Sequence, residues 1–423
     1  MKFVLYSLNY SPELTGIGKY NGELGKSMPD YGVDVSVITA PPYYPEWQVH
    51  SGFANHYSTQ RDSGVTIYRN PLYVPKRVST IKRLVHLASF ALSSFGRLLT
   101  LLTKKPDVVF VVQPTLFCVP GALIFCWLTG AKTIMHIQDY EVDAMFGLGM
   151  VGNAADSQHS SPSMAKRVAL GIERMLMRRF DCVSSISHSM LARAEQKGVD
   201  KDKLLFFPNW ADTSFVSPEV SGAELKAQWG YQPDDKIVLY SGNIGNKQGL
   251  EIVIQAADAL KSRASAKFII IGNGSYRDEL EAQAQRLGLN NIRFLPLQAW
   301  ELVPQILRMA DIHLVVQKKG VADAVLPSKL TNILAAGGHA LVTGESDTEL
   351  GKIARLYPGI YRLVEPENTS VFIEALEQML DSDTRVINQI ARDYAVENIN
   401  KDKVIGRFVE NLQQIIESGK VPQ

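Results

Sequence analysis

A chain of 423 residues with 31 Gly and 20 Pro is long enough for two or three domains with their own cores, which excludes a peptide hormone or a single small binding module. Its content of 46% hydrophobic and 21% charged residues excludes a disordered or low-complexity chain. The net charge of +1 argues against a dedicated nucleic-acid binder. The first 210 residues nevertheless carry 22 Lys and Arg against 16 Asp and Glu, a net +6, and the remainder carries 22 against 27, a net −5.

The N-terminus and the cysteines indicate the compartment. The opening residues MKFVLYSLNYSPE hold only a short apolar run, broken by Asn9 and Pro12, without a small-residue cleavage site, so we expect no signal peptide. The three cysteines, Cys118, Cys126 and Cys182, lie in apolar surroundings and form neither a disulfide framework nor a C-x-x-C metal site. We therefore expect a protein of the reducing cytoplasm.

Apolar strand candidates alternate with helical or loop stretches through the first half of the chain. This alternation predicts an α/β domain with a doubly wound parallel sheet. The candidate strands are residues 2–8, 34–40, 65–69, 107–112, 132–138 and 181–186.

The same pattern restarts after a turn-rich segment at residues 207–210. We expect an N-terminal Rossmann-like domain over 1–208, a second one over 209–400, and a last helix over 401–423 that could pack on either domain, possibly returning to the first. Two such sheets create a cleft between the carboxyl ends of their strands, where ligands of these folds bind. The candidate strands of the second half are residues 236–241, 267–272, 292–296, 311–317, 339–343 and 361–365.

The charge-free run from Val108 to Ala131 is long enough to cross a bilayer. However, Val108 to Val112 reads as a β-branched strand that Gln113-Pro114 ends, and a separate apolar helix pattern follows it. The mean hydropathy of −0.04 gives an integral membrane protein no support. A buried strand followed by a packed helix is the interpretation we adopt.

The first strand-to-helix turn contains Gly16 and Gly18. Glycines allow close backbone approach, and the N–H groups that open the next helix favour a phosphate or oxyanion. A dinucleotide fingerprint fails, because Asn21 stands where its third glycine would be. A glycine-rich surface turn is nearly as good an explanation.

The predicted strand 132–138 and the turn after it hold His136 and Asp139, followed by Glu141 and Asp143. A histidine at such a strand end can orient a ligand or exchange a proton near neutral pH, and nearby carboxylates can fix its tautomer and hold sugar hydroxyls. A metal site is the weaker hypothesis, because no second His stands at ligand spacing. A histidine satisfied within the core is the structural alternative.

Two turns of the second half have the composition of phosphate or nucleotide sites. One, over 241–249, combines small residues and exposed amides with a single lysine, which suits a diphosphate, but its spacing is not that of a Walker motif. The other, at 272–274, suits a base or ribose lying against the backbone. Taken singly, each is also a common turn between a strand and a helix. The residues concerned are Gly242, Asn243, Gly245, Lys247, Gly272, Asn273 and Gly274.

A third element is the helix start at Pro327, followed by Ser328 and Lys329. A lysine in the first turn of a helix opposes the helix dipole, so a bound anion is its natural compensation. The upstream loop over 317–323 adds polar groups at the same sheet edge. For Lys318 and Lys319, a solvated charge run is the alternative.

No acidic residue occurs between Asp62 and Asp107, while basic residues flank an apolar pattern of helical period from Ile81 to Leu102. Such a basic amphipathic helix can dock on anionic lipid. A core helix with solvated ends is the structural alternative. Nucleic acid is a weaker one, because the basic residues lack an aromatic stacking platform.

The motifs together, SPELTGIGKY, MHIQDYE, FPNWAD, YSGNIGNKQGLE, IGNG and LPSKLTNILAAGG, resemble the retaining nucleotide-sugar glycosyltransferases of family four, over nearly the whole chain and in order. That resemblance implies the two-domain GT-B fold. Within the family, NYSPELTGIGKY, TAPPYYPEWQV and HIQDYEVDAM are similar to enzymes of colanic-acid assembly. The resemblance therefore implies transfer of a hexose, L-fucose from GDP-fucose, to a polyprenyl-diphosphate-linked sugar at the inner face of the cytoplasmic membrane.

The resemblance also implies a role for each bend. Gly16 and Gly18 would lie against the donor phosphate and the acceptor, His136 would contact the donor sugar, and the bend at 272–274 would face the base. No metal or other cofactor is implied, because amides and lysines neutralise the departing diphosphate. Retention would follow front-face attack with the leaving phosphate as base, without a protein nucleophile. The diphosphate would be held by Asn243, Gly245, Lys247, Ser328 and Lys329, and the catalytic candidates are His136, Asp139, Lys247 and Lys329.

The sequence departs from the family pattern in its polar residues. Asn243 stands where the family has Arg, and Lys247 lies one position before the family's Lys. Ala324 and Asn332 replace a pair of glutamates eight residues apart, which leaves Asp323 as the substitute. These departures keep two alternatives open: a non-catalytic nucleotide-sugar-binding scaffold of a polysaccharide assembly complex, and a nucleotide-sugar epimerase.

Overall fold

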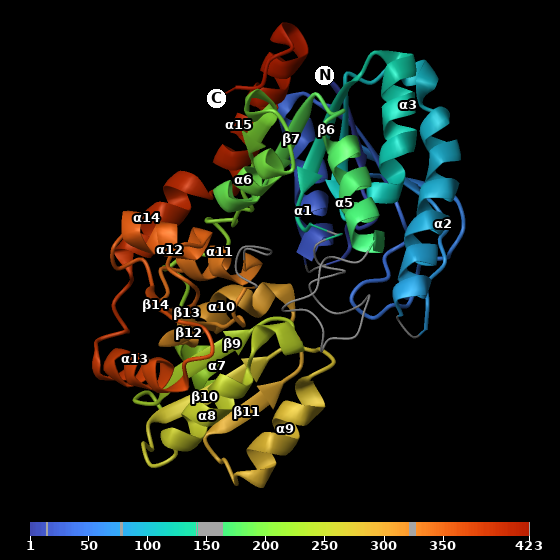
Figure 1. Cartoon of the computed structure of the whole chain (residues 1–423). Coiled ribbons are helices and arrows are strands. Elements are labelled where there is room, and N and C mark those ends of the chain that lie inside the picture. Colours follow the sequence, from blue (N-terminus) through green and yellow to red (C-terminus); the bar gives the residue numbers. More distant parts are fainter. Residues whose placement is uncertain (14–15, 77–78, 141, 143–163, 321–326, 423) are drawn as a thin grey trace. The chain divides into compact units, whose positions relative to one another are not determined.

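The computed structural model describes residues 1–13, 16–76, 79–140, 142, 164–320 and 327–422. The chain divides into two compact units: Met1–Pro208 together with Ile405–Gln423, and Asn209–Val404. Each unit is a parallel-sheet α/β domain with helices on both faces of its sheet (Figure 1). The predicted fold class is confirmed for each unit, while the facing of the two sheets across a cleft stays a prediction.

The first unit contains an eight-stranded sheet in the order β3-β4-β2-β1-β5-β6-β7-β8. All its pairs are parallel except β3 with β4, which is antiparallel. The sequence pattern predicted neither β3 nor β8, because β3 is a polar edge strand, STQRD, without an apolar run, and β8 has only three residues. The strands are β1 (Lys2–Tyr6), β2 (Asp34–Thr39), β3 (Ser58–Asp62), β4 (Val65–Arg69), β5 (Val108–Gln113), β6 (Lys132–Ile137), β7 (Cys182–Ser185) and β8 (Leu204–Phe206).

The strand order fixes where the helices of the first unit lie. Crossovers between parallel strands are right-handed, so connections that run from β4 toward β8 share one face of the sheet, and the β1-to-β2 connection lies on the other. Helices α2, α3, α5 and α6 therefore lie on one face, and α1 covers the opposite face; Figure 1 shows α2 and α3 side by side. The helices are α1 (Gly16–Ser27), α2 (Thr80–Leu99), α3 (Val119–Thr129), α5 (Met164–Met177) and α6 (His188–Gln196).

The C-terminal helix α15 (Lys401–Ser418) contributes its residues from Ile405 onward to the first unit. There the Phe408 ring stacks on Phe207 with centroids 3.9 Å apart and meets Phe110 of β5 at 5.3 Å. All three rings are buried. The helix is thus part of the core of the first unit.

The second unit contains six parallel strands in the order β11-β10-β9-β12-β13-β14. All six predicted strands are present, with ends within two residues of the predicted ones. Their β-branched and aromatic side chains are buried on both faces, as expected for a parallel sheet covered by helices. The strands are β9 (Lys236–Ser241), β10 (Ala266–Ile271), β11 (Ile292–Leu295), β12 (Ile312–Val315), β13 (Ala340–Thr343) and β14 (Arg362–Val364).

The helices of the second unit connect these strands and close the domain. In an open parallel sheet, ligands bind at the carboxyl ends where the strand order reverses, which here means between β9 and β12, and between β1 and β5 in the first unit. The helices are α7 (Ala223–Gln228), α8 (Glu251–Ala259), α9 (Arg277–Arg286), α10 (Val303–Met309), α11 (Ser328–Ala335), α12 (Glu349–Leu356), α13 (Thr369–Asp381) and α14 (Gln389–Asn398).

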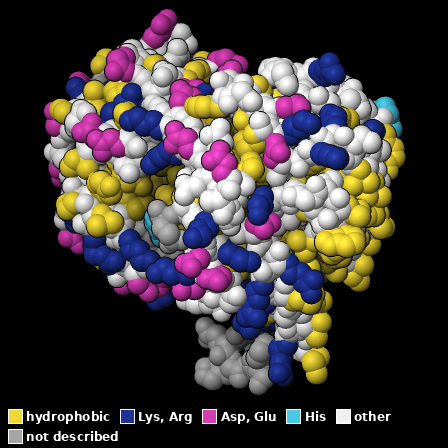
Figure 2. All heavy atoms as spheres, turned by 90° about the horizontal axis from the view of Figure 1, so that it is seen from above, with side chains coloured by type: hydrophobic (Ala, Val, Ile, Leu, Met, Phe, Trp, Pro, Cys, Tyr) yellow, Lys and Arg dark blue, Asp and Glu magenta, His cyan; other side chains and the backbone are white. Residues whose placement is uncertain are grey.

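The charge-free run 108–131 folds as the buried strand β5 and the helix α3, as the sequence predicted. Among the described residues, no helix has the length and apolar content to cross a membrane. One side of α3 is nevertheless exposed, including Trp127 and Ile124. Figure 2 shows hydrophobic side chains gathered on the right of the view, over the side of the molecule where Figure 1 places α2 and α3.

The stacking of Phe408 predicts a large effect of the Phe408→Ala substitution. Loss of a buried ring and the remaining cavity should lower the free energy of unfolding of the first unit by about 3–5 kcal/mol. Urea unfolding followed by circular dichroism measures the shift in midpoint. The exposed Leu356 of the second unit is the control, because its change to alanine should cost under about 0.5 kcal/mol. An unchanged midpoint in the Phe408 variant would refute the packing of α15.

Candidate active site

The most unusual polar group of the second unit is Lys329, the second residue of α11. Its Nζ atom is buried and has no hydrogen-bond partner among the described residues. It lies 3.5 Å from the centroid of the Tyr240 ring, at the carboxyl end of β9. The sequence-predicted lysine is therefore at the point of the sheet where ligands of this fold bind.

Burial lowers the pKa of Lys329 to about 7, because an ammonium ion loses its hydration there. The face of Tyr240 offers a weak attraction to the cation, and the N-terminus of α11 opposes it. A negatively charged ligand would supply the missing partner. The arrangement thus fits a phosphate or another anion.

The absence of a side chain at Gly242 provides the space that the Lys329 ammonium occupies. Its φ is +152°, and a Cβ atom built on it would lie 2.8 Å from the Lys329 Nζ atom. The Tyr240 hydroxyl donates a 2.6 Å hydrogen bond to the carbonyl oxygen of Asn243. Tyr240 therefore holds both the bend after β9 and the lysine above its ring.

The glycines of the next bend have a structural reason that the sequence did not reveal. A Cβ atom at Gly272 would lie 1.9 Å from the carbonyl oxygen of Gly242, and one at Gly274 would lie 2.0 Å from that of Ile244. The Ile244 N–H also donates to the carbonyl oxygen of Asn273, at 2.9 Å. The two bends pack backbone against backbone, so these glycines are explained without a base or ribose, and the predicted contact with the base stays a prediction.

Sequence reasoning missed the arginine that braces this bend. Arg277 donates from Nη1 to the carbonyl oxygens of Gly272, at 2.8 Å, and Leu295, at 3.0 Å, and pairs through Nε with Glu281. Its position four residues after Asn273, at the start of α9, was the available signal. The guanidinium of Arg277 therefore binds protein groups and braces the bend.

The remaining residues of the predicted diphosphate cradle line the bend after β9. Asn243 is exposed, and Lys247 is partly exposed in the short turn that precedes α8. The Gly245 N–H donates to the Gln248 side chain at 3.0 Å, so this amide is already engaged. Lys247 and the exposed amide of Asn243 are the groups of this bend that can reach a ligand.

The lysines of the loop after β12 have protein partners. The Lys318 ammonium donates to Asn246 at 2.6 Å and lies 3.6 Å from Glu251. Lys319 pairs with Glu345 at 3.8 Å. These ion pairs distinguish them from Lys329 and argue against a free anion site there.

Helix α11 carries two further candidates. Ser328 is exposed, and its carbonyl oxygen accepts a hydrogen bond from Thr331. The Oδ1 atom of Asn332 is buried without a partner among the described residues, as is the Nε2 atom of Gln317, two residues after β12. Asn332 lies one helical turn after Lys329, on the same face. The predicted ligand Asp323 lies outside the described residues, as do Glu141 and Asp143.

In the first unit, the turn at Gly16 and Gly18 opens α1, and Gly16 adopts a left-handed φ of +58°. A Cβ atom on Gly18 would lie 2.6 Å from Glu13, whose side chain is only 2% exposed. The Glu13 carboxylate accepts the backbone N–H groups of Tyr43 and Tyr44, each at 3.0 Å. Burial raises the pKa of Glu13. Gly18 therefore provides space for the buried Glu13 carboxylate, which links this turn to the loop after β2. The sequence analysis did not identify this role of Glu13.

His136 lies in the core of the first unit rather than at an open strand end. Its side chain is 2% exposed and stacks on Phe110 with ring centroids 5.2 Å apart. Its Nδ1 atom is 3.0 Å from the Ser184 hydroxyl, and its Nε2 atom is 3.0 Å from the Gln138 amide nitrogen. A donating amide fixes the neutral ring with its proton on Nδ1.

Burial lowers the pKa of His136 to about 3, so the ring does not exchange protons near neutral pH. This corrects the expectation of a proton-exchanging histidine and supports the alternative of a satisfied core residue. The correction has a physical cause: both ring nitrogens are used within the sheet and the ring faces are covered by phenylalanines. Contact with the donor sugar stays a prediction.

Asp139 is partly exposed in the turn after β6. Burial, and then the charge of Asp139, raise the pKa of the Tyr44 hydroxyl. Asp139 therefore lies close to the loop that Glu13 holds.

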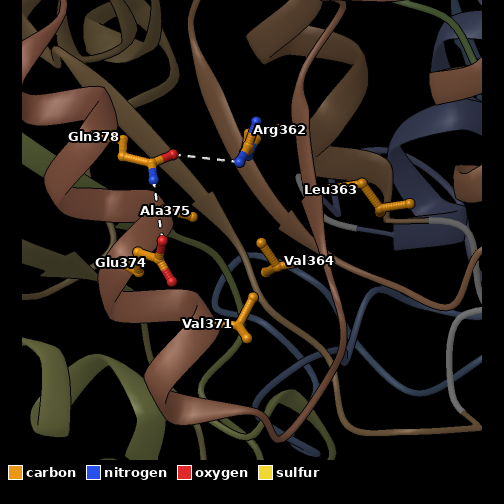
Figure 3. Close-up of a pocket in the computed structure, with 7 residues that line it drawn as sticks. All are labelled: Arg362, Leu363, Val364, Val371, Glu374, Ala375 and Gln378. Atoms are coloured by element: carbon orange, nitrogen blue, oxygen red, sulfur yellow. Dashed lines mark hydrogen bonds between the residues drawn. The ribbon is translucent and has the colours of Figure 1, made fainter.

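A surface pocket of 330 Å³ lies elsewhere, between β14 and α13. Figure 3 shows Gln378 between Arg362 and Glu374, with hydrogen bonds of 3.3 and 3.2 Å. None of the sequence-predicted residues lines it. Within the described part of the chain, no group of three or more His, Cys, Asp or Glu could hold a metal ion.

Comparison with known protein families identifies both halves of the chain. The model of the glycosyl transferase 4-like domain matches residues 15–210, and that of glycosyl transferases group 1 matches residues 222–401. The chain is 46% identical over 416 residues to WcaI of Escherichia coli (strain K12), which covers 98% of this chain and all of that protein. The chain is a family-four glycosyltransferase with the GT-B fold.

Two solved structures share the fold of this enzyme. Sucrose-phosphate synthase of Thermosynechococcus elongatus superposes with a TM-score of 0.74 at 15% identity, over 99% of each chain. HepE of Anabaena, solved in complex with UDP-glucose, superposes with a TM-score of 0.69 at 15% identity, over 98% of this glycosyltransferase and all of HepE.

The Lys329 ammonium, which has no partner in the described part of the chain, predicts opposite effects of Lys329→Met on stability and binding. Methionine removes a buried charge and keeps the packing, so the melting temperature of the unliganded enzyme should rise by roughly 2–4 °C. The further rise that GDP or UDP produces in the wild type should be lost. Differential scanning calorimetry measures both.

Lys261 is the matched control, because it is exposed and its ion pair with Asp258 lies on the surface. Its change to methionine should leave both temperatures nearly unchanged. A Lys329→Met enzyme that melts lower and still responds to nucleotide would refute the anion site.

Proposed function

We propose that this glycosyltransferase moves L-fucose from GDP-fucose to a polyprenyl-diphosphate-linked sugar during assembly of a colanic-acid-like exopolysaccharide. The similarity to WcaI over the full chain supports the pathway, because the name of that protein describes it as a glycosyl transferase of colanic acid biosynthesis. The single structural observation that carries the donor site is the buried ammonium of Lys329, for which the described residues supply no hydrogen-bond partner. HepE, solved with UDP-glucose, supports a nucleotide sugar as donor.

The reaction needs a site that stabilises the charge of the leaving group. As the bond between the sugar and the diphosphate breaks, negative charge grows on the phosphate oxygens. The Lys329 side chain, charged once the diphosphate is bound, would stabilise that charge together with Lys247 and the amide of Asn243 on the neighbouring bend, with little reorganisation. In a retaining reaction the acceptor hydroxyl attacks the same face and its proton passes to the departing phosphate, so a protein nucleophile is not required.

We expect the proposed reaction to be independent of metal ions, because lysine side chains would neutralise the charge of the departing diphosphate. The described residues hold no cluster that suits a metal ion. Metal independence stays a prediction, and its test is transfer in the presence of EDTA.

The lipid-linked acceptor places the enzyme at the inner face of the anionic cytoplasmic membrane, as a peripheral protein. The first unit has 24 Lys and Arg against 18 Asp and Glu, a net +6 that favours such a surface. The inner side of α2 is packed, with Leu87, Phe90 and Leu98 buried, so the core-helix interpretation is correct for that side. Docking would use the outer side of the helical layer.

The two alternatives make different products. A scaffold subunit would bind the nucleotide sugar and release no product, and an epimerase would release a changed sugar in the absence of lipid. The family-model matches along both halves of the chain favour the transferase over either.

Incubation of the pure enzyme with labelled GDP-fucose and polyprenyl-diphosphate-linked glucose should give a labelled lipid, before and after addition of EDTA. The Lys329→Met enzyme should transfer roughly a hundredfold more slowly, because it lacks one charge-stabilising donor. Lys261→Met should transfer at the wild-type rate. Absence of transfer from every nucleotide sugar tested would contradict the proposed function.

The lowered pKa of Lys329 predicts proton uptake on binding. With a pKa of about 7, the amine is mostly neutral at pH 8 in the unliganded enzyme, and a bound diphosphate favours its charged form and raises that pKa. GDP binding at pH 8 should therefore take up roughly one proton more in the wild type than in Lys329→Met. The difference should vanish at pH 6, where the amine is already charged. Calorimetric titration in buffers of different ionisation enthalpy counts the protons, and equal counts at pH 8 would contradict the contact.

A further inference from the structure

The helical layer of the first unit exposes an apolar surface that the reaction at Lys329 does not use. On α3, Ile124, Trp127 and Leu128 are exposed, and Trp127 is 82% exposed. Their spacing of three and four residues places them on one face of the helix. Figure 2 shows hydrophobic side chains gathered over this side of the molecule.

Helix α5 carries a second apolar stripe. Met164, Val168, Ile172 and Met175 are all exposed and recur at intervals of four, four and three residues. The opposite side of α5 is packed through Leu176 and Met177. The stripe therefore faces outward along the whole helix.

Helix α2 completes the surface, which we call the outer face. Its Ile81, Val85 and Leu92 are exposed on one side of the helix, spaced by four and seven residues. Helices α2 and α3 pack tightly, because a Cβ atom on Gly121 would lie 2.7 Å from the Phe95 ring. The outer face consists of Ile81, Val85, Leu92, Ile124, Trp127, Leu128, Met164, Val168, Ile172 and Met175.

The charges of these three helices are nearly all positive. Their acidic member, Glu173, is buried and forms an ion pair with Lys197 of the next helical segment. Basic residues flank the apolar stripes on both α2 and α5. They are Lys82, Arg83, Arg97, Lys166, Arg167 and Arg174.

This combination matches an anionic lipid surface better than a second copy of the chain. An apolar surface of this extent on a folded protein marks an interaction site. Symmetric pairing of two copies would bring the basic residues of one outer face against those of the other, which costs electrostatic energy. A bilayer instead accepts apolar side chains, tolerates Trp at its interface, and offers anionic headgroups to the flanking cations.

We propose that the outer face of α2, α3 and α5 docks on an anionic bilayer, with the apolar stripes of α3 and α5 inserted between headgroups. The proposal rests on the proposed membrane location of the reaction and names the surface that provides it. Charge alone would hold the protein above the membrane, whereas insertion of apolar side chains adds affinity that salt does not screen.

Flotation of the full-length enzyme with vesicles of equal parts phosphatidylcholine and phosphatidylglycerol tests the docking. The wild type should float with these vesicles and keep a large part of its binding at high salt. Two double variants, Ile124→Glu with Trp127→Glu, and Val168→Glu with Ile172→Glu, should each reduce the bound fraction by roughly tenfold or more.

The matched control replaces equally exposed apolar residues of the second unit, Leu356 and Val386, which are 74% and 60% exposed, with glutamate. This control should float like the wild type, although it carries the same added charge. Melting temperatures and the response to GDP should be unchanged in all variants, because the mutated side chains are exposed. Quenching by acyl-brominated lipid should be strong in the wild type and weaker in Trp127→Phe.

Each outcome bears on a different claim. Double variants of α3 and α5 that float like the wild type would overturn the inference and leave membrane association to another surface. The wild type could instead fail to float with the vesicles and sediment as a dimer without lipid. If the double variants abolished that dimer, the outer face would be assigned to a second copy of the chain. Transfer to a lipid-linked sugar measured in detergent would still report on the proposed function in either case.

Discussion

The arrangement of the second unit depends on a lysine ammonium held in a buried position without a partner among the described residues. Burying such a group opposes folding, because the ammonium loses its hydration. Its cation–π contact with Tyr240 offsets only part of that free-energy cost. The large apolar core of the six-stranded sheet offsets this cost. Gly242 is constrained by the same feature, since any side chain there would occupy the space of the ammonium. A lysine positioned before the ligand arrives suits electrostatic catalysis, because proton uptake on binding completes its charge and the side chain does not have to move when charge develops on the leaving group.

The sheet order explains why distant residues meet at this point. Tyr240 lies at the carboxyl end of β9 and Gly242 follows that strand, Lys329 follows β12, and these strands are neighbours where the order of the sheet reverses. The first unit has the same reversal between β1 and β5, where Glu13 accepts backbone amides, and on the neighbouring β6 His136 is held neutral between Ser184 and Gln138. The Tyr10 hydroxyl after β1 and the Gln113 amide nitrogen at the end of β5 are buried without a partner among the described residues. One topology therefore places a buried lysine at the reversal in one unit, and a buried carboxylate and a neutral histidine near the reversal in the other.

The sequence predicted what depends on local pattern and on composition. The parallel strands of both sheets other than the three-residue β8, the helix start at Lys329 and the packing of residues 108–131 as β5 and α3 follow from runs of apolar residues and turn signals. The polar edge strand β3 gave no such run. The state of His136 depends on Phe110 and Phe207, which are far away in the sequence, so its burial was not visible there. The glycines at 272 and 274 were assigned to a ligand, because sequence spacing does not reveal that another bend passes within 2 Å of their missing side chains.

The charge-free helix α3 raised the question of a membrane span, and its structure gives that composition another meaning. A helix packed on a sheet needs an apolar stripe on its inner side only, and polar residues normally cover the rest. Here the outer side is apolar too, which the fold does not require and which water disfavours. On the proposed docking, the two units have complementary tasks: the first is net positive and meets an anionic surface, while the second unit, with 20 Lys and Arg against 25 Asp and Glu, is net negative and is repelled by it. Repulsion of the second unit would keep its donor site in water, where a soluble nucleotide sugar is found, and the local ammonium at Lys329 would attract that anion against the overall charge.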